Sequence, residues 1–279
     1  PAAAVAMGFT GFEIGTDIGG SIRLPSSHCG VYGHKPSFGV IPTYGYLDSV
    51  EYHRNVADVN VFGPIARSID DLDLLVDLLA GPNPDDAPGW RLELPPPRAT
   101  ELADFRVAAW LDDSFCPVDA SVTAVLEQAV GALESAGARI DYDLRPALEP
   151  MSASVDGSIL IGAATDISDA QDGMSHLMWD TMHRQRGQLR QRWTEFFGDV
   201  DVLLCPVSPT PAFQHVHSSQ GSNWAHAVLR EFDDMPYRHL LRWNTLIGSA
   251  YLPVTVPPVG RTPGGLPVGI QVVAPFLHD

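Results

Sequence analysis

The sequence has little positive charge. Its 279 residues contain 17 Lys and Arg against 34 Asp and Glu, which gives a formal net charge of −17, and no dense basic run occurs. Nucleic-acid-binding proteins neutralise phosphates with clustered Lys and Arg. The composition therefore excludes nucleic acid as an expected partner, and an acidic surface also repels anionic lipid.

Cysteine and long apolar runs are also scarce. The three cysteines, Cys29, Cys116 and Cys205, form an odd and widely spaced set that fits neither a disulfide framework nor a zinc-binding CxxC pair. A reducing compartment is the simpler interpretation, so we expect a cytoplasmic protein. The apolar runs are too short to cross a bilayer, and no basic signal-peptide region precedes the N-terminal residues. We expect no membrane partner.

The order of the hydrophobic patterns favours an α/β fold. Arg106 to Trp110 is typical of a buried strand, Ala120 to Ala136 of an amphipathic helix closed by Gly137, and Arg139 to Tyr142 of a second strand. Such a unit favours parallel pairing. Helices are also predicted for Ala2–Met7, Ser68–Leu79 and Ser175–Phe197, loops for Cys29–Gly45 and Gly81–Pro97, and strands for Phe12–Ile14, Val200–Cys205, Leu252–Val256 and Pro267–Val273.

The stretch from Gly15 to Val40 carries the chemistry. Gly19 and Gly20 stand directly before Ser21, where they let the backbone adopt conformations closed to other residues. Consecutive N–H groups in such a turn can bind a developing oxyanion, next to an exposed serine nucleophile. The turn lacks the lysine of a P-loop and the second glycine of a GxSxG elbow. By itself, however, a glycine-serine turn is most often only a turn.

The wider string resembles the amidase signature family. The signature's GTDIGGSIR segment ends in Ser21-Ile22-Arg23 here and is followed by Pro25, Cys29-Gly30 and a Gly-x-Lys-Pro-Ser motif. Further matching motifs follow in the family's order: Gly63-Pro64-Ile65-Ala66-Arg67-Ser68, Asp201-Val202-Leu203-Leu204-Cys205-Pro206 and Leu266-Pro267-Val268-Gly269-Ile270-Gln271. The region from about Pro82 to Gln214 matches loosely, and substrate selectivity is expected there.

The resemblance implies a cofactor-independent amidase that uses a Ser-cisSer-Lys triad and holds no metal. Ser21 matches the nucleophile, and the backbone N–H groups of Ile18, Gly19, Gly20 and Ser21 match the oxyanion donors. The expected reaction is hydrolysis of a carboxylic amide to the acid plus ammonia or an amine, through an acyl-enzyme. The implied fold is a single α/β domain, a mixed and mostly parallel sheet surrounded by helices.

The family's lysine and cis-serine have no counterpart in these 279 residues. In the family's pattern, both residues precede the position of Pro1. We therefore expect residues 1–279 to be an incomplete amidase-signature domain whose C-terminal end is also truncated. By itself such a fragment is expected to be inactive. Two other functions stay open: a glutaminase-like subunit of a tRNA-dependent amidotransferase, and a non-catalytic scaffold. The resemblance also leaves a homodimer open.

Residues around the turn are expected to support it. Thr16 and Asp17 precede it, and the Asp17 carboxylate is placed to accept loop N–H bonds or to pair with Arg23. Lys35 is an alternative base for Ser21, but it matches the structural Lys-Pro pair of the family, and no SxxK spacing connects the two residues.

Other reactive residues have simpler interpretations. Cys29 has no His-Asn pair placed by sequence and is expected to be a buried thiol. His28 and His34 flank it without a fourth zinc ligand. His176, Asp180 and His183 share a predicted helix and are expected to form a solvated polar face. The four arginines at positions 184, 186, 190 and 192 are expected to be solvated or paired with acids.

Overall fold

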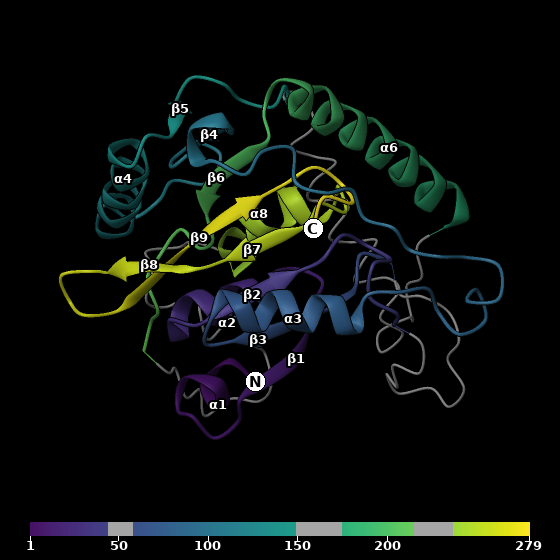
Figure 1. Cartoon of the computed structure of the whole chain (residues 1–279). Helices are drawn as coiled ribbons and strands as arrows, with labels where there is room; N and C mark the ends of the chain where they lie inside the picture. Colours follow the sequence, from purple (N-terminus) through teal and green to yellow (C-terminus); the bar gives the residue numbers. More distant parts are fainter. Residues whose placement is uncertain (44–57, 149–174, 215–236) are drawn as a thin grey trace.

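One mixed sheet runs through the described parts of the chain (Figure 1). The computed structural model describes residues 1–43, 58–148, 175–214 and 237–279. The strand order is β1-β3-β2-β7-β9-β6-β4-β5, and β8 pairs with β9 beside this path. The strands are β1 (Phe12–Asp17), β2 (Tyr32–Lys35), β3 (Val61–Ala66), β4 (Arg106–Ala109), β5 (Arg139–Asp141), β6 (Val202–Pro206), β7 (Val254–Val256), β8 (Pro258–Arg261) and β9 (Pro267–Val273).

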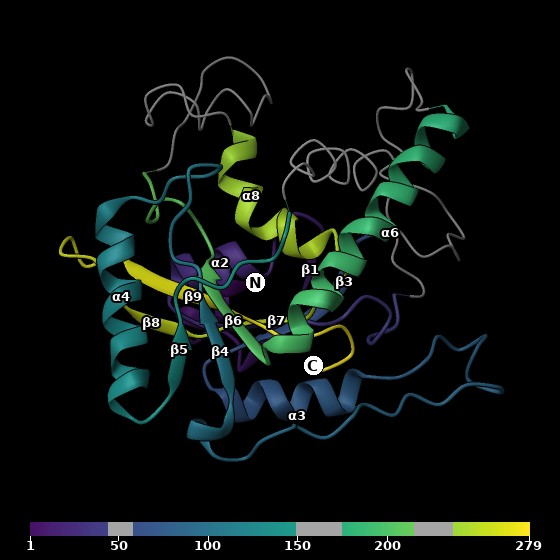
Figure 2. The ribbon, with the colours of Figure 1, turned by 90° about the horizontal axis from the view of Figure 1, so that it is seen from above.

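Helices cover both faces of this sheet. They are α1 (Ala2–Ala6), α2 (Arg23–Cys29), α3 (Ile69–Leu79), α4 (Ala120–Ser135), α6 (His176–Asp199) and α8 (Tyr237–Gly248), with a 3₁₀ turn at Leu102–Asp104. Ala108 and Leu203 share a core with α6 and α8, whereas Val107 and Leu204 pack with α4. Because side chains alternate along a strand, α4 lies on the face opposite α6 and α8 (Figure 2). The α/β class with a mixed sheet is confirmed.

The expected predominance of parallel pairing is wrong. Among the described strands, the two pairs that β4 forms with β5 and β6 are parallel, and the other six pairs are antiparallel. Parallel neighbours need a crossover connection, which α4 supplies between β4 and β5. β7, β8 and β9 instead follow one another closely along the chain and pair antiparallel. The strand-helix-strand unit therefore predicted its own strands correctly but not the rest of the sheet.

Several predicted elements are confirmed within a few residues. Ser68 caps α3, and its side chain accepts a hydrogen bond from the Asp71 backbone N–H at 3.1 Å. The helix predicted for Ala120–Ala136 is α4, and Gly137 after it has a φ of +104°. β9 has the predicted bounds. These segments carry strong local signals, namely caps, glycine stops and regular apolar spacing.

The segment expected as a loop from Cys29 to Gly45 contains a strand. β2 occupies Tyr32–Lys35 between β3 and β7, while residues 44 and 45 lie outside the described residues. β3 was not expected either, since it contains Gly63 and Pro64. Pro64 has no N–H to donate, but β2 pairs with β3 only at Ile65 and Ala66, so the proline interrupts no ladder on that side.

The helix predicted for Ser175–Phe197 is α6, and its buried residues start at Met182. Leu177 and Met178, in its first turn, are apolar but 75% and 51% exposed. Arg186 was expected to be solvated or paired with an acid; it is paired with Asp58, and it is 1% exposed. Pairing with a carboxylate offsets the cost of removing a buried guanidinium from water. The spacing of hydrophobic residues in a sequence carries no information about such a pair.

Within the described ranges, no helix combines the length and the apolar character that a bilayer crossing requires.

Candidate active site

Ser21 lies in the turn between β1 and α2. β1 ends at Asp17, three bend residues follow, and the first turn of α2 starts two residues after Ser21. Ser21 is exposed, whereas its neighbours Gly20 and Ile22 are buried. The expected geometry of an accessible serine on a tightly held backbone is therefore present. The role of Ser21 in a reaction stays a prediction.

The carboxylate of Asp17 organises this turn from inside. One oxygen, Oδ1, accepts the Gly20 N–H at 2.9 Å, and Oδ2 accepts the N–H groups of Ile22 at 3.1 Å and Arg23 at 3.3 Å. The Arg23 guanidinium also pairs with both oxygens, at 2.8 Å and 3.0 Å, and both side chains are fully buried. Asp17 thus makes both contacts that the sequence suggested for it.

Electrostatics keep this carboxylate ionised. Burial alone raises the pKa of Asp17, but the charge and the hydrogen bonds of Arg23 outweigh it and hold the pKa below its ordinary value. An ionised Asp17 accepts hydrogen bonds only, as its contacts with the turn require. Thr16, by contrast, pairs with Phe62 in the sheet, and its hydroxyl makes no hydrogen bond within the described part of the chain.

The predicted set of four oxyanion donors needs one correction. The Gly20 N–H already donates to Asp17, so it is a part of the turn's own structure. The N–H groups of Ile18, Gly19 and Ser21 have no acceptor among the residues that the structure describes. These three groups stay the candidates for an oxyanion.

The backbone conformation of the turn before Ser21 requires a glycine at position 20. Its φ is +127°, a region that L side chains rarely adopt. A Cβ there would also lie 2.9 Å from Cγ of Asn244 and 3.1 Å from Leu24. Gly19 is less restricted, because a Cβ at that position would make an ordinary contact of 3.5 Å with Leu241.

Arg23 connects the turn to distant elements. Its Nη1 donates to the backbone carbonyl of Asn244 on α8 at 2.8 Å and to the side chain of Gln271 on β9 at 3.1 Å. Gln271 in turn donates to the Pro206 carbonyl at the end of β6, at 2.6 Å. The Ser21 turn is therefore fixed against three elements that lie far from it in sequence.

Lys35 lies beneath this network and is the only lysine of the chain. The residue is 1% exposed, and its ammonium donates to the carbonyls of Pro36 at 2.9 Å and Leu252 at 2.8 Å. Burial lowers the pKa of Lys35 to about 7, Arg23 acts in the same direction, and Asp17 and Asp279 oppose it. Both described contacts bind backbone rather than Ser21, which supports the structural interpretation of Lys35 over a base.

The residues around Cys29 have separate partners. None of the three cysteines forms a disulfide, and burial raises the pKa of the half-buried Cys29 thiol. Burial lowers the pKa of His28, whose ring meets that of Phe213 edge-on. His34 instead contacts the Thr255 hydroxyl at 2.9 Å and the Asp279 carboxylate at 3.3 Å.

The polar residues of α6 form a surface, as expected. His176 and His183 are exposed and stack on Trp179, and Asp180 pairs with Arg184 at 2.8 Å. Arg192 lies 3.5 Å from Glu195, and Arg190 covers the rings of Tyr251 and Phe276. Across the described ranges, no three His, Cys, Asp or Glu side chains come together as a metal-binding group.

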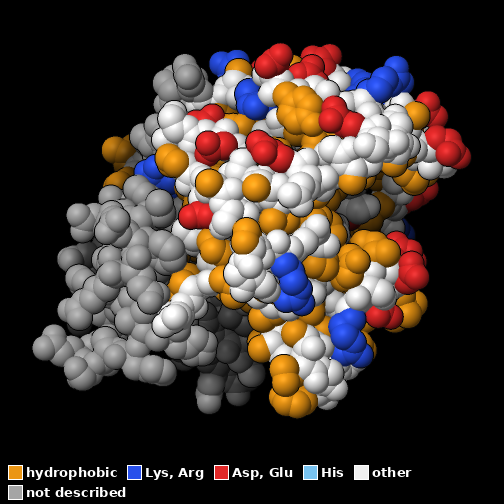
Figure 3. Space-filling view, turned by 90° about the vertical axis from the view of Figure 1, so that its left-hand side faces the viewer, with side chains coloured by type: hydrophobic (Ala, Val, Ile, Leu, Met, Phe, Trp, Pro, Cys, Tyr) orange, Lys and Arg blue, Asp and Glu red, His pale blue; other side chains and the backbone are white. Residues whose placement is uncertain are grey.

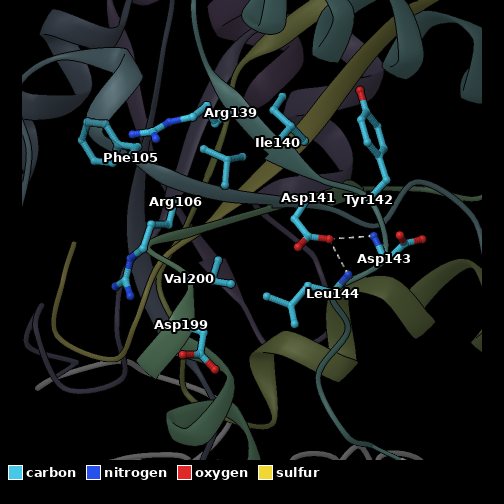
Figure 4. A pocket seen from close by; sticks show the side chains of 11 residues that line it. Phe105, Arg106, Arg139, Ile140, Asp141, Tyr142, Asp143, Leu144, Asp199 and Val200 are labelled. Carbon is cyan, nitrogen blue, oxygen red and sulfur yellow. Dashed lines mark hydrogen bonds between the residues drawn. The ribbon is translucent and has the colours of Figure 1, made fainter.

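A pocket of about 610 Å³ lies elsewhere, at the β5 edge of the sheet (Figure 4). In Figure 4, Arg106 and Arg139 extend from neighbouring strands, and Asp141 accepts the N–H groups of Asp143 and Leu144. Arg106 is already paired with Asp201, and Arg139 donates to the Ala103 carbonyl. β5 and β1 are opposite edges of the sheet, so this pocket is separate from the Ser21 turn.

Two residues of the site were not singled out from the sequence. Asn244 had no motif signal, and Gln271 stood in a recognised motif without a role. The signal that the sequence offers for Gln271 is weak: a polar residue within a predicted strand. Its partner Arg23 is 248 positions away, and only the fold brings them together.

Comparison with known proteins identifies the family. A model of the Amidase family matches residues 1–171 and 150–279, which together span the chain. An acylamidase of Rhodococcus erythropolis is 30% identical, with 99% of this chain and 60% of the relative covered. A glutamyl-tRNA(Gln) amidotransferase subunit from Deinococcus radiodurans is also 30% identical, with 100% of this chain and 63% of the relative covered.

A solved structure supports the fold independently. The chain matches the structure of 6-aminohexanoate cyclic dimer hydrolase with a TM-score of 0.76 at 22% identity, covering 99% of this chain and 64% of the other. The chain spans about three-fifths of the length of the curated relatives named above. The family model spans the chain and the solved structure shares its fold, so the chain belongs to the amidase signature family.

Proposed function

We propose that the protein carrying this chain is an amidase that hydrolyses a carboxylic amide through an acyl-enzyme on Ser21. The observation that carries the proposal is the exposed Ser21 on a turn held by the buried Asp17–Arg23 pair. A nucleophile needs access to substrate and a fixed direction of attack. The similarity to an acylamidase supports the same reaction class.

The proposed chemistry starts with attack of Ser21 Oγ on the amide carbonyl. The developing oxyanion is bound by the backbone N–H groups of Ile18, Gly19 and Ser21, and each such donor contributes on the order of 3 kcal/mol in the transition state. In the family's scheme, a cis-serine relays the Ser21 proton to a neutral lysine and then protonates the leaving amine. Water then hydrolyses the ester and releases the acid.

A glutaminase-like subunit of a tRNA-dependent amidotransferase is the second candidate. It is favoured by the similarity to the Deinococcus radiodurans protein, which equals the acylamidase in identity. Glutamine hydrolysis that depends on a copurifying tRNA-binding partner supports this candidate, whereas partner-independent hydrolysis of aryl or alkyl amides supports an amidase. A scaffold without either activity is the third candidate, and the oligomeric state, including a homodimer, stays a prediction.

The test is labelling of the full-length protein with a fluorophosphonate. Ser21 Oγ displaces fluoride from phosphorus, so a P–O bond forms, a P–F bond breaks and the proton passes to the base. We expect Ser21→Ala to abolish both labelling and amide hydrolysis. Ser135→Ala, at an exposed serine of α4, is the matched control and is expected to retain both. Undiminished turnover of Ser21→Ala overturns the proposal.

A further inference from the structure

Asn244 of α8 lies directly behind the Ser21 turn. Its side chain is completely buried, and a Cβ on Gly20 would lie 2.9 Å from its Cγ and 3.2 Å from its Cβ. The amide group therefore packs against the backbone of the residue before the proposed nucleophile. Gly20 is also the residue with the φ of +127°.

The position of this amide is fixed from two sides. Its Nδ2 donates to the Val207 carbonyl, in the segment after β6, at 2.6 Å. Its own backbone carbonyl accepts Arg23 Nη1 at 2.8 Å. Arg23 pairs with Asp17, and Asp17 accepts the Gly20 N–H. A closed ring of contacts thus leads from the Gly20 backbone through Asp17, Arg23 and Asn244 back to Gly20.

The remaining polar atom of Asn244 is not explained by packing. Oδ1 is buried and accepts no hydrogen bond within the described residues. An unsatisfied buried acceptor costs about 1–3 kcal/mol, a cost that an apolar side chain of similar size does not carry. The amide is therefore a poor choice for filling space alone.

We infer that Asn244 is a positioning residue for Ser21: it fixes the Gly20 backbone in its positive-φ conformation and so sets the direction of Ser21 Oγ. The inference rests on the proposed function. In this role Asn244 acts on the Gly20 backbone rather than on the reacting atoms. Its effect passes through Gly20, and the ring of contacts makes that effect depend on the placement of α8.

The first experiment measures how fast saturating fluorophosphonate labels Ser21 in full-length Asn244→Ala. We expect the labelling rate constant to fall about 10- to 100-fold, because a nucleophile misplaced by about 1 Å loses on the order of 100-fold in rate. For the amide substrate, kcat is expected to fall by a similar factor with little change in KM. Circular dichroism establishes that the variant is folded.

The matched control is Trp243→Phe. Trp243 is the neighbouring residue of α8, is also fully buried, and donates one hydrogen bond to the Cys116 carbonyl at 3.1 Å. The variant loses one buried hydrogen bond from the same helix without touching Gly20. We expect it to lower thermal stability and to keep a labelling rate within about twofold of the wild type. Equal losses in both variants overturn the inference.

A second variant, Asn244→Asp, tests the inference through the pH dependence of the labelling rate, which a purely structural role of Asn244 would leave unchanged. A protonated carboxyl has the amide's shape and donates to the Val207 carbonyl, whereas an ionised one repels it. We expect the ratio of variant to wild-type labelling rates to rise as the pH falls, measured where both proteins are folded. A ratio that does not change with pH contradicts the inference.

Failure of the inference is distinguishable from failure of the proposed function. If wild-type Ser21 is not labelled and no amide is hydrolysed, the proposed function fails. If wild-type labelling depends on Ser21 but Asn244→Ala is labelled at the wild-type rate, the function stands and the positioning role is wrong.

Discussion

At the scale of single residues, the two glycines before Ser21 have different tasks. Gly20 combines a positive φ with the contact to Asn244, whereas Gly19 has neither restriction. We expect Gly20→Ala to lower the free energy of unfolding by about 1–3 kcal/mol, the usual cost of a strained backbone residue. Urea denaturation of the two alanine variants tests this, with Gly19→Ala expected to lose less. A larger loss in Gly19→Ala contradicts this account of the turn.

Lys35 allows a direct test of the electrostatics beneath the turn. In full-length protein labelled with ¹³C-lysine, the Cε resonance that disappears in Lys35→Met belongs to Lys35, and its pH titration is followed. We expect a midpoint near 7, since burial and Arg23 lower the pKa of Lys35 to about 7. A midpoint near that of free lysine contradicts the buried position.

The lowered pKa of Lys35 also predicts how the stability of the protein depends on pH. Unfolded Lys35 titrates near its ordinary pKa of 10.5, so between about pH 7 and 10.5 the unfolded state binds more protons than the folded state. The contribution of Lys35 to stability therefore rises with pH across that window. We expect urea denaturation to give the wild type a larger free energy of unfolding at pH 9 than at pH 7. Lys35→Met is expected to lack this increase. An equal gain in both proteins contradicts the linkage.

At the scale of elements, α6 is attached to the sheet through a buried charge. Arg186 Nη1 contacts the Asp58 carboxylate at 2.6 Å and the Tyr251 hydroxyl at 2.6 Å, and Tyr251 also donates to Asp58. The Arg186 side chain is 1% exposed and that of Asp58 is 16% exposed. Removing Asp58 leaves a buried cation without its carboxylate, whereas removing Arg186 leaves a carboxylate that water can reach.

We therefore expect the two halves of this pair to respond unequally. Asp58→Ala is expected to lower the free energy of unfolding by about 3–5 kcal/mol, and Arg186→Met by clearly less. Asp180→Ala, which breaks the exposed pair with Arg184, is the control and is expected to cost under about 1 kcal/mol. Urea denaturation of the three variants measures the differences. A larger loss in Arg186→Met than in Asp58→Ala contradicts this assignment.

The elements also mark where sequence reasoning ends. α3 and α4 were predictable because a serine cap and a glycine stop act within one turn of the chain. β3 was not, because Pro64 argues against a strand until the short pairing with β2 is known. The acid that pairs with Arg186 was not identified from the sequence, because Asp58 is 128 positions away. Local sequence patterns therefore predicted helices and strands, whereas polar contacts between distant residues could not be predicted from the sequence.

At the scale of the whole molecule, the same division applies to the site. The Gly19-Gly20-Ser21 motif and the role of Asp17 in the turn were predictable because they lie within seven residues. The contacts of Arg23 with Asn244 and with Gln271 join residues more than 200 positions apart, so only the assembled sheet reveals them. The direction of strand pairing belongs to this scale too, since six of the eight described pairs are antiparallel despite one parallel unit.

The charge of the whole chain bears on how a glutaminase-like subunit would bind tRNA. On the face in Figure 3, acidic side chains gather in the upper part, whereas apolar side chains are more frequent below. With a net charge of −17, the chain lacks the clustered cations that release counterions from tRNA. If the protein is a glutaminase-like subunit, we therefore expect the tRNA-binding surface to lie outside these 279 residues.

We accordingly expect the protein carrying this chain, without partners, to bind labelled tRNA more weakly than about 100 μM at physiological salt, the weak end of ordinary non-specific binding. Fluorescence anisotropy at 50 mM and 150 mM salt measures this, with an acidic protein of similar size as the control. A glutaminase-like subunit would gain tRNA binding only when its partner is added, whereas an amidase would gain none. Tight, salt-sensitive binding by the protein alone contradicts the argument from charge.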